Sequence, residues 1–345
     1  MAQDLTICTV SYDSGPYIEL NLALTERLNP GEQPRWLVCE NSPAGSAYRF
    51  SSSRQDAVSI IEGPPAQDYG KATGSYHHAE GLARLLPLVR TRFLLVVDPD
   101  FFVIYSHWIS AVINHMEQNG LSFFGAPWHA SYITKYRYFP CVHCVFIDLS
   151  KVDIATLDFR PAFDEIKHRP AEIPLMLKPF LPFFTKKQPD RQRFLVDKRQ
   201  TVGSSPDTGY RIYRQYANDA KYRYECLIPA FNPARDSKYL RNKTNRFLER
   251  FCPESLSYAP KRKGSYTHRY FRDAGGLDAA QWGWDEFFWR ERPFGFHIRN
   301  YLKTKHNVST VADQAQCLER ALGSWSGLLG QFDDNVARLN AAYGE

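Results

Sequence analysis

The fold of this chain is decided by residues 92–100, which have the sequence RFLLVVDPD. The apolar run from Phe93 to Val97 is unbroken, which is typical of a strand covered on both faces in a parallel sheet. Residues 74–90, just before it, carry apolar side chains at helical spacing and predict a helix. A helix leading into a buried strand indicates an α/β chain, in which ligands bind beyond the carboxyl ends of the strands.

The alternation of helices and strands continues on both sides of this run. Apolar runs predict strands over residues 5–10, 36–39, 57–61 and 121–124, and helices are expected over residues 16–28 and 107–118. Strands separated by helices favour a parallel, doubly wound sheet. After about residue 125 the alternation stops, and the later expectations are strands at 141–149 and 224–228, a short helix at 207–217 and two helices within 308–343.

The composition is that of a globular protein, and its positive net charge favours an anionic partner such as a nucleotide diphosphate, an acidic glycan or an anionic membrane surface. Of the 345 residues, 43% are hydrophobic and 23% charged, and the seven cysteines are odd in number, which suits reduced, buried thiols. The formal net charge of +6 is too small and too dispersed to indicate a nucleic-acid-binding protein. We find no export signal and no apolar run of about 20 residues, the length that spans a bilayer, and therefore expect a cytoplasmic protein.

A pair of carboxylates follows the central strand, in Asp98-Pro99-Asp100. Residues i and i+2 of an extended chain lie on the same side, and Pro99 restricts both its own φ and the conformation of Asp98. The two carboxylates therefore converge where an α/β sheet binds its ligand. A Mg²⁺ or Mn²⁺ ion that bridges to a diphosphate typically takes one or two such ligands. The alternative is a turn that caps the next helix.

Residues 81–100 resemble the helix, strand and DxD motif of the family-2-like GT-A glycosyltransferases. The start of the chain fits this resemblance too, with a strand followed by Ser11-Tyr12 and a second strand that ends in Glu40-Asn41-Ser42. The resemblance covers about residues 4–125 well and the rest only loosely. It implies an α/β, GT-A (Rossmann-like) fold, with a mostly parallel sheet flanked by helices. The implied parts are a nucleotide-sugar-binding subdomain at 1–125, an acceptor-binding and catalytic subdomain at 126–305 and a C-terminal helical segment at 306–345.

The resemblance also implies a set of donor and metal contacts. The ends of the first two strands would hold the nucleoside, and His78 would lie beside the ribose or sugar of the donor. Glu40 stands where the family more often has an Asp that meets the base. A late histidine, His297, would assist Asp98 and Asp100 at Mn²⁺ or Mg²⁺, and the donor would be a UDP-, GDP- or dTDP-sugar. The donor-binding residues expected in this way are Thr9, Ser11, Glu40, Asn41, His78 and Asp98.

Asp207 is the expected general base. It lies about a hundred residues past the DxD motif at the start of a predicted helix, where inverting members of the family carry an acidic residue that takes the proton of the acceptor hydroxyl. Asp is also a favourable helix N-cap, so a purely structural role is the alternative. The usual acidic doublet of the family is missing here, and Asp285 with Glu286 is the rival pair.

Together these observations predict a metal-dependent glycosyltransferase that acts on a glycan or glycolipid acceptor and has no nucleic-acid partner. A retaining transferase, a nucleotidyltransferase and a non-catalytic carbohydrate-binding protein are the alternatives. The segment from Leu175 to Phe184, followed by Lys186 and Lys187, has the composition of a peripheral contact with an anionic membrane, although a buried loop is an equal interpretation.

Overall fold

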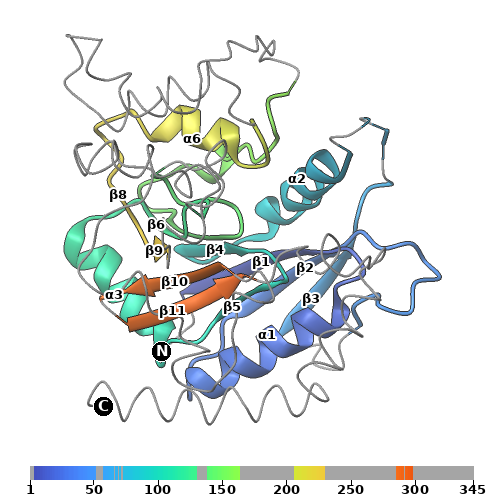
Figure 1. Ribbon diagram of the computed structural model, residues 1–345, viewed down its shortest axis with the longest axis horizontal. Coiled ribbons are helices and arrows are strands. Elements are labelled where there is room, and N and C mark those ends of the chain that lie inside the picture. The colour runs from blue at the N-terminus through green and yellow to red at the C-terminus, as the bar shows by residue number, and fades with distance from the viewer. Residues whose placement is uncertain are drawn as a thin grey trace, which may run out of the picture.

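The computed structural model describes residues 4–51, 57–65, 67–68, 70, 73–129, 138–163, 206–229, 285–290 and 292–297. These residues form an α/β fold with two sheets and helices on both faces of the larger one (Figure 1). The predicted membrane-contact segment at residues 175–187 and the C-terminal segment 306–345 lie outside the described residues.

The larger sheet has seven strands in the order β3-β2-β1-β4-β7-β6-β8. The first four, in order from the edge, are parallel, β7 is antiparallel to both of its neighbours, and β8 is parallel to β6. The predicted fold class, a mostly parallel sheet flanked by helices, is therefore confirmed. The bounds are β1 Leu5–Ser11, β2 Arg35–Glu40, β3 Val58–Glu62, β4 Phe93–Val97, β6 Phe123–Gly125, β7 Cys144–Asp148 and β8 Tyr224–Cys226.

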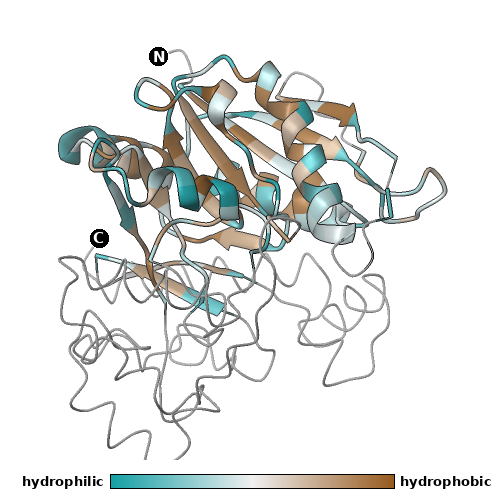
Figure 2. Cartoon of the chain, turned by 90° about the horizontal axis from the view of Figure 1, so that it is seen from above, coloured by the Kyte–Doolittle hydropathy of each residue, from teal (hydrophilic) through white to brown (hydrophobic). Residues whose placement is uncertain are grey.

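Strand β4 contributes to two cores because its side chains alternate between the faces of the sheet. Leu95 lies in a core with helices α1 (Gly15–Leu28) and α3 (Trp108–Asn119), whereas Leu94 lies in a second core with α2 (Thr73–Leu85) and α6 (Tyr210–Tyr216). Figure 2 shows mostly hydrophobic strands between helices that carry both hydrophilic and hydrophobic residues. All five residues of β4 are buried, as the unbroken apolar run predicts.

A smaller antiparallel sheet, in the order β5-β11-β10-β9, lies beside the carboxyl end of β4. Its strands are β5 (Phe101–Val103), β11 (Arg292–His297), β10 (Asp285–Trp289) and β9 (Ile228–Pro229). Strand β5 follows directly after Asp100 and pairs with β11, which places His297 opposite Phe101. This pairing brings a residue from late in the chain next to the DxD turn.

Two helix predictions need correction. The helix predicted over 74–90 ends at Leu85 and continues as a 3-10 turn, η2 (Leu86–Leu88), because Pro87 has no backbone N–H to continue the α-helical pattern. The helix predicted from Asp207 begins at Tyr210 instead, with Gly209 as its N-cap. Gly209 has a φ of +80°, a conformation that glycine adopts without strain. A second short 3-10 turn, η3, spans Ile154–Thr156.

Three further features bear on the predictions. Strands β7 and β8 belong to the same sheet as the strands within residues 1–125. The division of the chain into subdomains at 1–125, 126–305 and 306–345 stays a prediction. The five described cysteines are buried and free, as expected for reduced thiols. Among the described residues, no helix is both long and apolar enough to cross a bilayer.

Candidate functional site

The candidate site lies where β1, β2 and β4 end at one edge of the larger sheet. Ser11 at the end of β1 is paired with Glu40 at the end of β2, and Asp98 follows the last residue of β4. The DxD turn is closed by the Phe101 backbone N–H, which donates to Asp98 O at 3.0 Å. Asn21 of α1 also fixes the turn, because its Nδ2 donates to Pro99 O at 2.8 Å.

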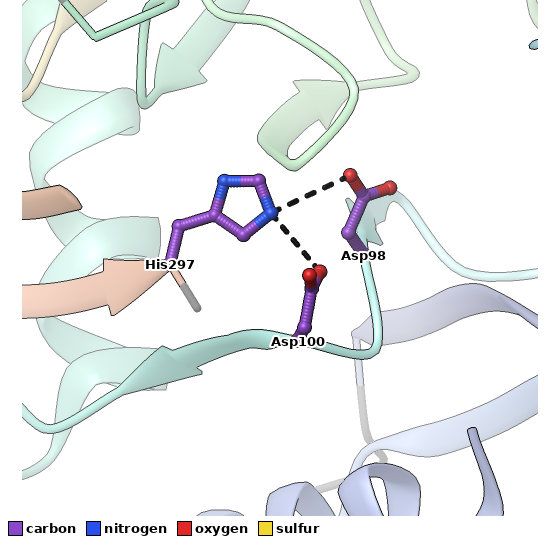
Figure 3. Close-up of side chains that lie close together, drawn as sticks. All are labelled: Asp98, Asp100 and His297. Carbon is purple, nitrogen blue, oxygen red and sulfur yellow. Dashed lines mark hydrogen bonds and ion pairs between the residues drawn. The ribbon is translucent and has the colours of Figure 1, made fainter. Parts of the chain in front are cut away.

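Asp98, Asp100 and His297 converge at this edge (Figure 3). The His297 Nε2 atom lies 3.0 Å from Asp100 Oδ1 and 3.9 Å from Asp98 Oδ2. One potential ligand atom from each residue lies within 4.8 Å of the others, and no other group of three potential metal ligands occurs in the described part of the chain. The side chain of His297 is 8% exposed, whereas those of Asp98 and Asp100 are 24% and 33% exposed. The carboxylates are therefore accessible from solvent.

The donor set fits a divalent cation. Carboxylate oxygens are ligands for Mg²⁺ and Mn²⁺, and the imidazole nitrogen suits first-row transition metals. The Nε2 atom of His297 faces both carboxylates, so the three donor atoms point toward a common centre (Figure 3). Tyr17 lies near this charge, and burial, then the negative charge of Asp100, raises the pKa of its phenol. Tyr17 is therefore a neutral side chain beside the carboxylates.

Helix α2 brings His78 to one of these carboxylates, that of Asp98. The Nε2 atom of His78 lies 3.5 Å from Asp98 Oδ1, and both side chains are partly exposed. The neighbouring His77 is turned away from them, since its Nε2 lies 2.9 Å from Pro64 O and its ring is buried. The structure therefore places His78, and not His77, at the candidate site.

Asp207 reaches the amino-terminal turn of α2. Its Oδ1 accepts from Ser75 Oγ at 2.7 Å and from the backbone N–H of Thr208 at 2.9 Å. The N-cap alternative for Asp207 is wrong, because Gly209 occupies that position and no side chain caps α6. Ser75 and His78 are three residues apart and lie on one face of α2. Asp207 and Asp98, which contact these two residues, therefore approach the same face of the helix.

Glu40 and Asn41 support the loop that follows β2. Glu40 is 1% exposed, and its Oε1 and Oε2 accept from the backbone N–H groups of Ser42 and Phe50 at 2.8 and 2.7 Å. Asn41 donates from Nδ2 to His77 O at 2.9 Å and so ties this loop to α2. These contacts give both residues a structural role, and a contact of Glu40 or Asn41 with a nucleotide stays a prediction.

Thr9 and Ser11 have unused hydrogen-bonding capacity. Both lie on the same face of β1, and their side-chain oxygens are buried with no hydrogen-bond partner among the described residues. A buried polar group without a partner costs about 1–3 kcal/mol, so such a group is a candidate for a ligand contact.

The two rival candidates for the general base, Asp285 and Glu286, are buried. Asp285 and Glu286 are 4% and 2% exposed on β10, and Asp285 Oδ1 lies 3.3 Å from Nδ1 of the buried His129. A carboxylate buried in this way is poorly placed to meet an acceptor hydroxyl from solvent, which disfavours both residues as the general base.

Two further residues near the site have no role assigned by sequence reasoning. Tyr12, directly after β1, is 49% exposed, and its ring packs edge-on against His77 at 6.2 Å between centroids. His143, before β7, stacks on His297 at 4.9 Å. The sequence signal for His143 was its place in Cys141-Val-His-Cys144, which has metal-ligand spacing. However, the Cys141 and His143 side chains contact each other and do not form a three-ligand group.

No protein-family model matches this chain, and no curated protein sequence shows significant similarity to it. Solved structures that it is similar to include a mannosyltransferase, PcManGT, from Pyrobaculum calidifontis in complex with GDP-Man and Mn²⁺. The identity is 11% and the TM-score 0.29, over 43% of this chain and 45% of that one. The match to S. aureus TarS 1–349 has 10% identity and a TM-score of 0.35, over 99% of this chain and 92% of that one. The match to the galactosyltransferase LgtC, in complex with donor and acceptor sugar analogs, has 14% identity and a TM-score of 0.28, over 44% of this chain and 61% of that one.

This chain spans less than two thirds of the length of PcManGT and LgtC in their matches. Identities and TM-scores this low assign neither activity nor substrate to it, and we base its function on the geometry of the strand-end site.

Proposed function

We propose that this chain is a metal-dependent glycosyltransferase that moves a sugar from a nucleotide-sugar donor to a glycan or glycolipid acceptor with inversion at the transferred carbon. The observation that supports the proposal most strongly is the convergence of Asp98, Asp100 and His297 at the carboxyl end of β4. That edge is where open α/β sheets bind their ligands.

Charge explains why this edge needs a cation. Asp98 and Asp100 would repel a diphosphate if they met it alone. A divalent cation held by these carboxylates and by His297 would neutralise their two negative charges and present its own positive charge to the diphosphate. When bound, Mn²⁺ or Mg²⁺ supplies Lewis-acid stabilisation of the leaving diphosphate.

The donor nucleoside would lie across the ends of β1 and β2. The hydroxyls of Thr9 and Ser11 offer hydrogen bonds that no described residue uses, and Tyr12 offers an exposed aromatic face. Glu40 and Asn41 hold the loop after β2 in place beside them. In the proposed role, His78 lies between the donor and Asp98. Binding of UDP, GDP and dTDP distinguishes uracil, guanine and thymine as the base of the donor.

Asp207 would act as the general base. In an inverting displacement the acceptor oxygen attacks the anomeric carbon, the bond to the diphosphate breaks, and the acceptor proton passes to the Asp207 carboxylate. Ser75 supports this role because its hydroxyl holds Oδ1 of Asp207 on the face of α2 that carries His78. Asp98 contacts His78 on that face, which supports a base near the proposed metal site.

A thermal-shift screen of UDP, GDP and dTDP, each with and without Mn²⁺, tests the proposal. A ligand at a hundredfold excess over its Kd stabilises the native state by about 2.7 kcal/mol. We expect at least one nucleotide to raise the melting temperature of the full chain only when Mn²⁺ is present. Equal shifts with and without Mn²⁺, or no shift with any of the three, would contradict the proposed site.

A cytoplasmic location, with peripheral contact to an anionic membrane through residues 175–187, stays a prediction from the sequence. Flotation with anionic vesicles tests it, because screening shortens to about 3 Å at 1 M salt and should release an electrostatic contact. A protein that stays off such vesicles at low salt would have no such contact.

A further inference from the structure

His143 contacts two of the three residues of the proposed metal site. It directly precedes β7 and is 1% exposed. Its ring stacks on that of His297 with 4.9 Å between centroids and 22° between planes. Its backbone oxygen accepts a hydrogen bond from the Asp98 N–H at 3.2 Å. A single buried residue therefore holds one ligand by its side chain and another by its main chain.

His297 has an unusual need for such support. A histidine that ligates a metal almost always donates its other ring N–H to a carboxylate, a backbone carbonyl or water, which fixes the plane of the ring. The Nδ1 atom of His297 is buried and has no hydrogen-bond partner among the described residues. The orientation of this ring therefore depends on the aromatic surfaces that it packs against, and His143 makes the nearly parallel contact.

The ring of His143 is itself firmly held. It packs against Phe101 and Phe287, each at 5.7 Å between centroids, and it meets the edge of Trp128 at the same distance. The Cys141 Sγ atom lies 2.6 Å from His143 Nδ1. These neighbours come from three separate segments of the chain, so the ring has little freedom to turn.

We propose that His143 is a positioning residue that orients His297 for the metal through its aromatic face. The inference rests on the proposed metal site. It makes one chemical distinction that a general packing role does not make. The metal affinity requires a flat ring at position 143 and does not require the imidazole nitrogens.

Two variants separate the ring from its nitrogens. His143→Phe keeps a flat aromatic face, whereas His143→Gln keeps a polar side chain and removes the ring. We would measure the Mn²⁺ dissociation constant of the full chain from the electron paramagnetic resonance signal of free Mn²⁺. Thermal melts in EDTA would report the folded fraction of each variant. We expect His143→Phe to bind Mn²⁺ within about threefold of wild type and His143→Gln to bind it about 10–100-fold more weakly, the range seen when the support of a metal ligand is lost.

A matched control is Phe146→Leu, which removes a buried ring from β7. Phe146 packs against Trp108 and Phe124 and not against the three ligands. This variant should lose thermal stability and keep its Mn²⁺ affinity. Loss of affinity in the control to the same extent as in His143→Gln would mean that any damage to this core weakens the site, and would overturn the positioning role.

The outcomes separate the inference from the proposed function. A wild-type chain that does not bind Mn²⁺ overturns the metal site and the inference with it. A wild-type chain that binds Mn²⁺, with His143→Gln binding equally well, overturns the inference alone. Weak binding by a folded His143→Phe does the same, since it assigns the effect to the nitrogens. If His143→Gln does not fold, His143→Phe decides, with wild-type affinity in support and a tenfold or greater loss against.

Discussion

Replacing Asp207 by Asn separates its proposed chemical role from its structural one. Oδ1 of Asp207 accepts two hydrogen bonds, from Ser75 Oγ and from Thr208 N. Asn keeps an oxygen in that position, so both bonds can persist and the free energy of unfolding should change by no more than about 1 kcal/mol. Ala removes both bonds and should cost about 2 kcal/mol, at about 1 kcal/mol for each.

The catalytic effect should be much larger than the effect on stability. A general base contributes about 10²–10⁴-fold, which is about 3–5 kcal/mol of activation free energy. Asp207→Asn should therefore lower kcat by that factor, while the affinity for the donor stays near that of wild type. Initial rates at saturating donor and thermal melts of the same preparations measure the two effects. Ser75→Ala serves as the control for the effect on stability, because it removes one of the two hydrogen bonds to Asp207 and leaves the carboxylate in place.

Turnover of Asp207→Asn within a few-fold of wild type would refute the assignment. The reaction would then be retaining, or a different residue would act as the base. Asp285 and Glu286 are poor substitutes because both are buried on β10. A large and equal loss of melting temperature in the Asn and Ala variants would also contradict the reasoning, since it would show that the charge itself supports the fold.

Three further predictions follow from individual contacts. Glu40→Gln should lower the free energy of unfolding by about 1–3 kcal/mol, because its NH₂ group would face a backbone N–H; unchanged thermal melts with altered nucleotide selectivity would instead support a base contact. Burial opposes ionisation of Asp148, but hydrogen bonds from Arg92 and Ser150 outweigh it and lower the pKa of its carboxyl from the ordinary value of 3.8. The ionised Asp148 therefore stabilises the fold above pH 3.8, and this stabilisation is lost as the pH falls through the folded-state pKa. Asp148→Asn should therefore lower the melting temperature more at pH 7 than at about pH 3, and an equal loss at both would count against it. Burial raises the pKa of the Cys39 thiol from 9.0 to about 11, so its alkylation at pH 8 should be about a hundredfold slower than that of an exposed thiol. Timed mass spectrometry measures the two rates, and equal rates would show that the Cys39 thiol is accessible.

The central part of the fold could be predicted because its signals are local. The bounds of β4 follow from five consecutive apolar residues and the Asp-Pro-Asp turn that ends them. The end of α1 at Leu28 was also predicted. Such elements depend on side chains within one strand or a few helical turns, which the sequence displays directly.

The pairing that completes the site is not local. Strand β5 has three residues and gains its strand structure from pairing with β11, which lies almost two hundred residues later. Sequence reasoning brought His297 to the metal through family resemblance, and neither its distance to Asp100 nor its stacking on His143 has a signal in the sequence. Both contacts depend on how the smaller sheet packs against the end of β4.

The structural roles of Glu40 and Asp207 were also hidden in the sequence. Glu40 bonds to backbone N–H groups whose positions depend on the path of the loop from Ser42 to Phe50. Asp207 precedes a helix in the sequence but bonds to Ser75 of a different helix. Family resemblance indicated a nucleobase contact for Glu40 and a general base at Asp207, with an N-cap as the structural alternative for Asp207. Only the three-dimensional path of the chain reveals the hydrogen-bond partners of the two residues.

The most direct test of a metal-dependent transferase is the release of nucleoside diphosphate from a panel of UDP-, GDP- and dTDP-sugars, measured on the full chain with and without Mn²⁺. After treatment with EDTA, the wild-type chain should release no product, and added Mn²⁺ should restore release from at least one donor. Asp100→Ala should stay folded and show no Mn²⁺-dependent release. Equal release by the wild-type chain in EDTA and in Mn²⁺, or Mn²⁺-dependent release by Asp100→Ala at the wild-type rate, would contradict the assignment of Asp98, Asp100 and His297 as the metal site.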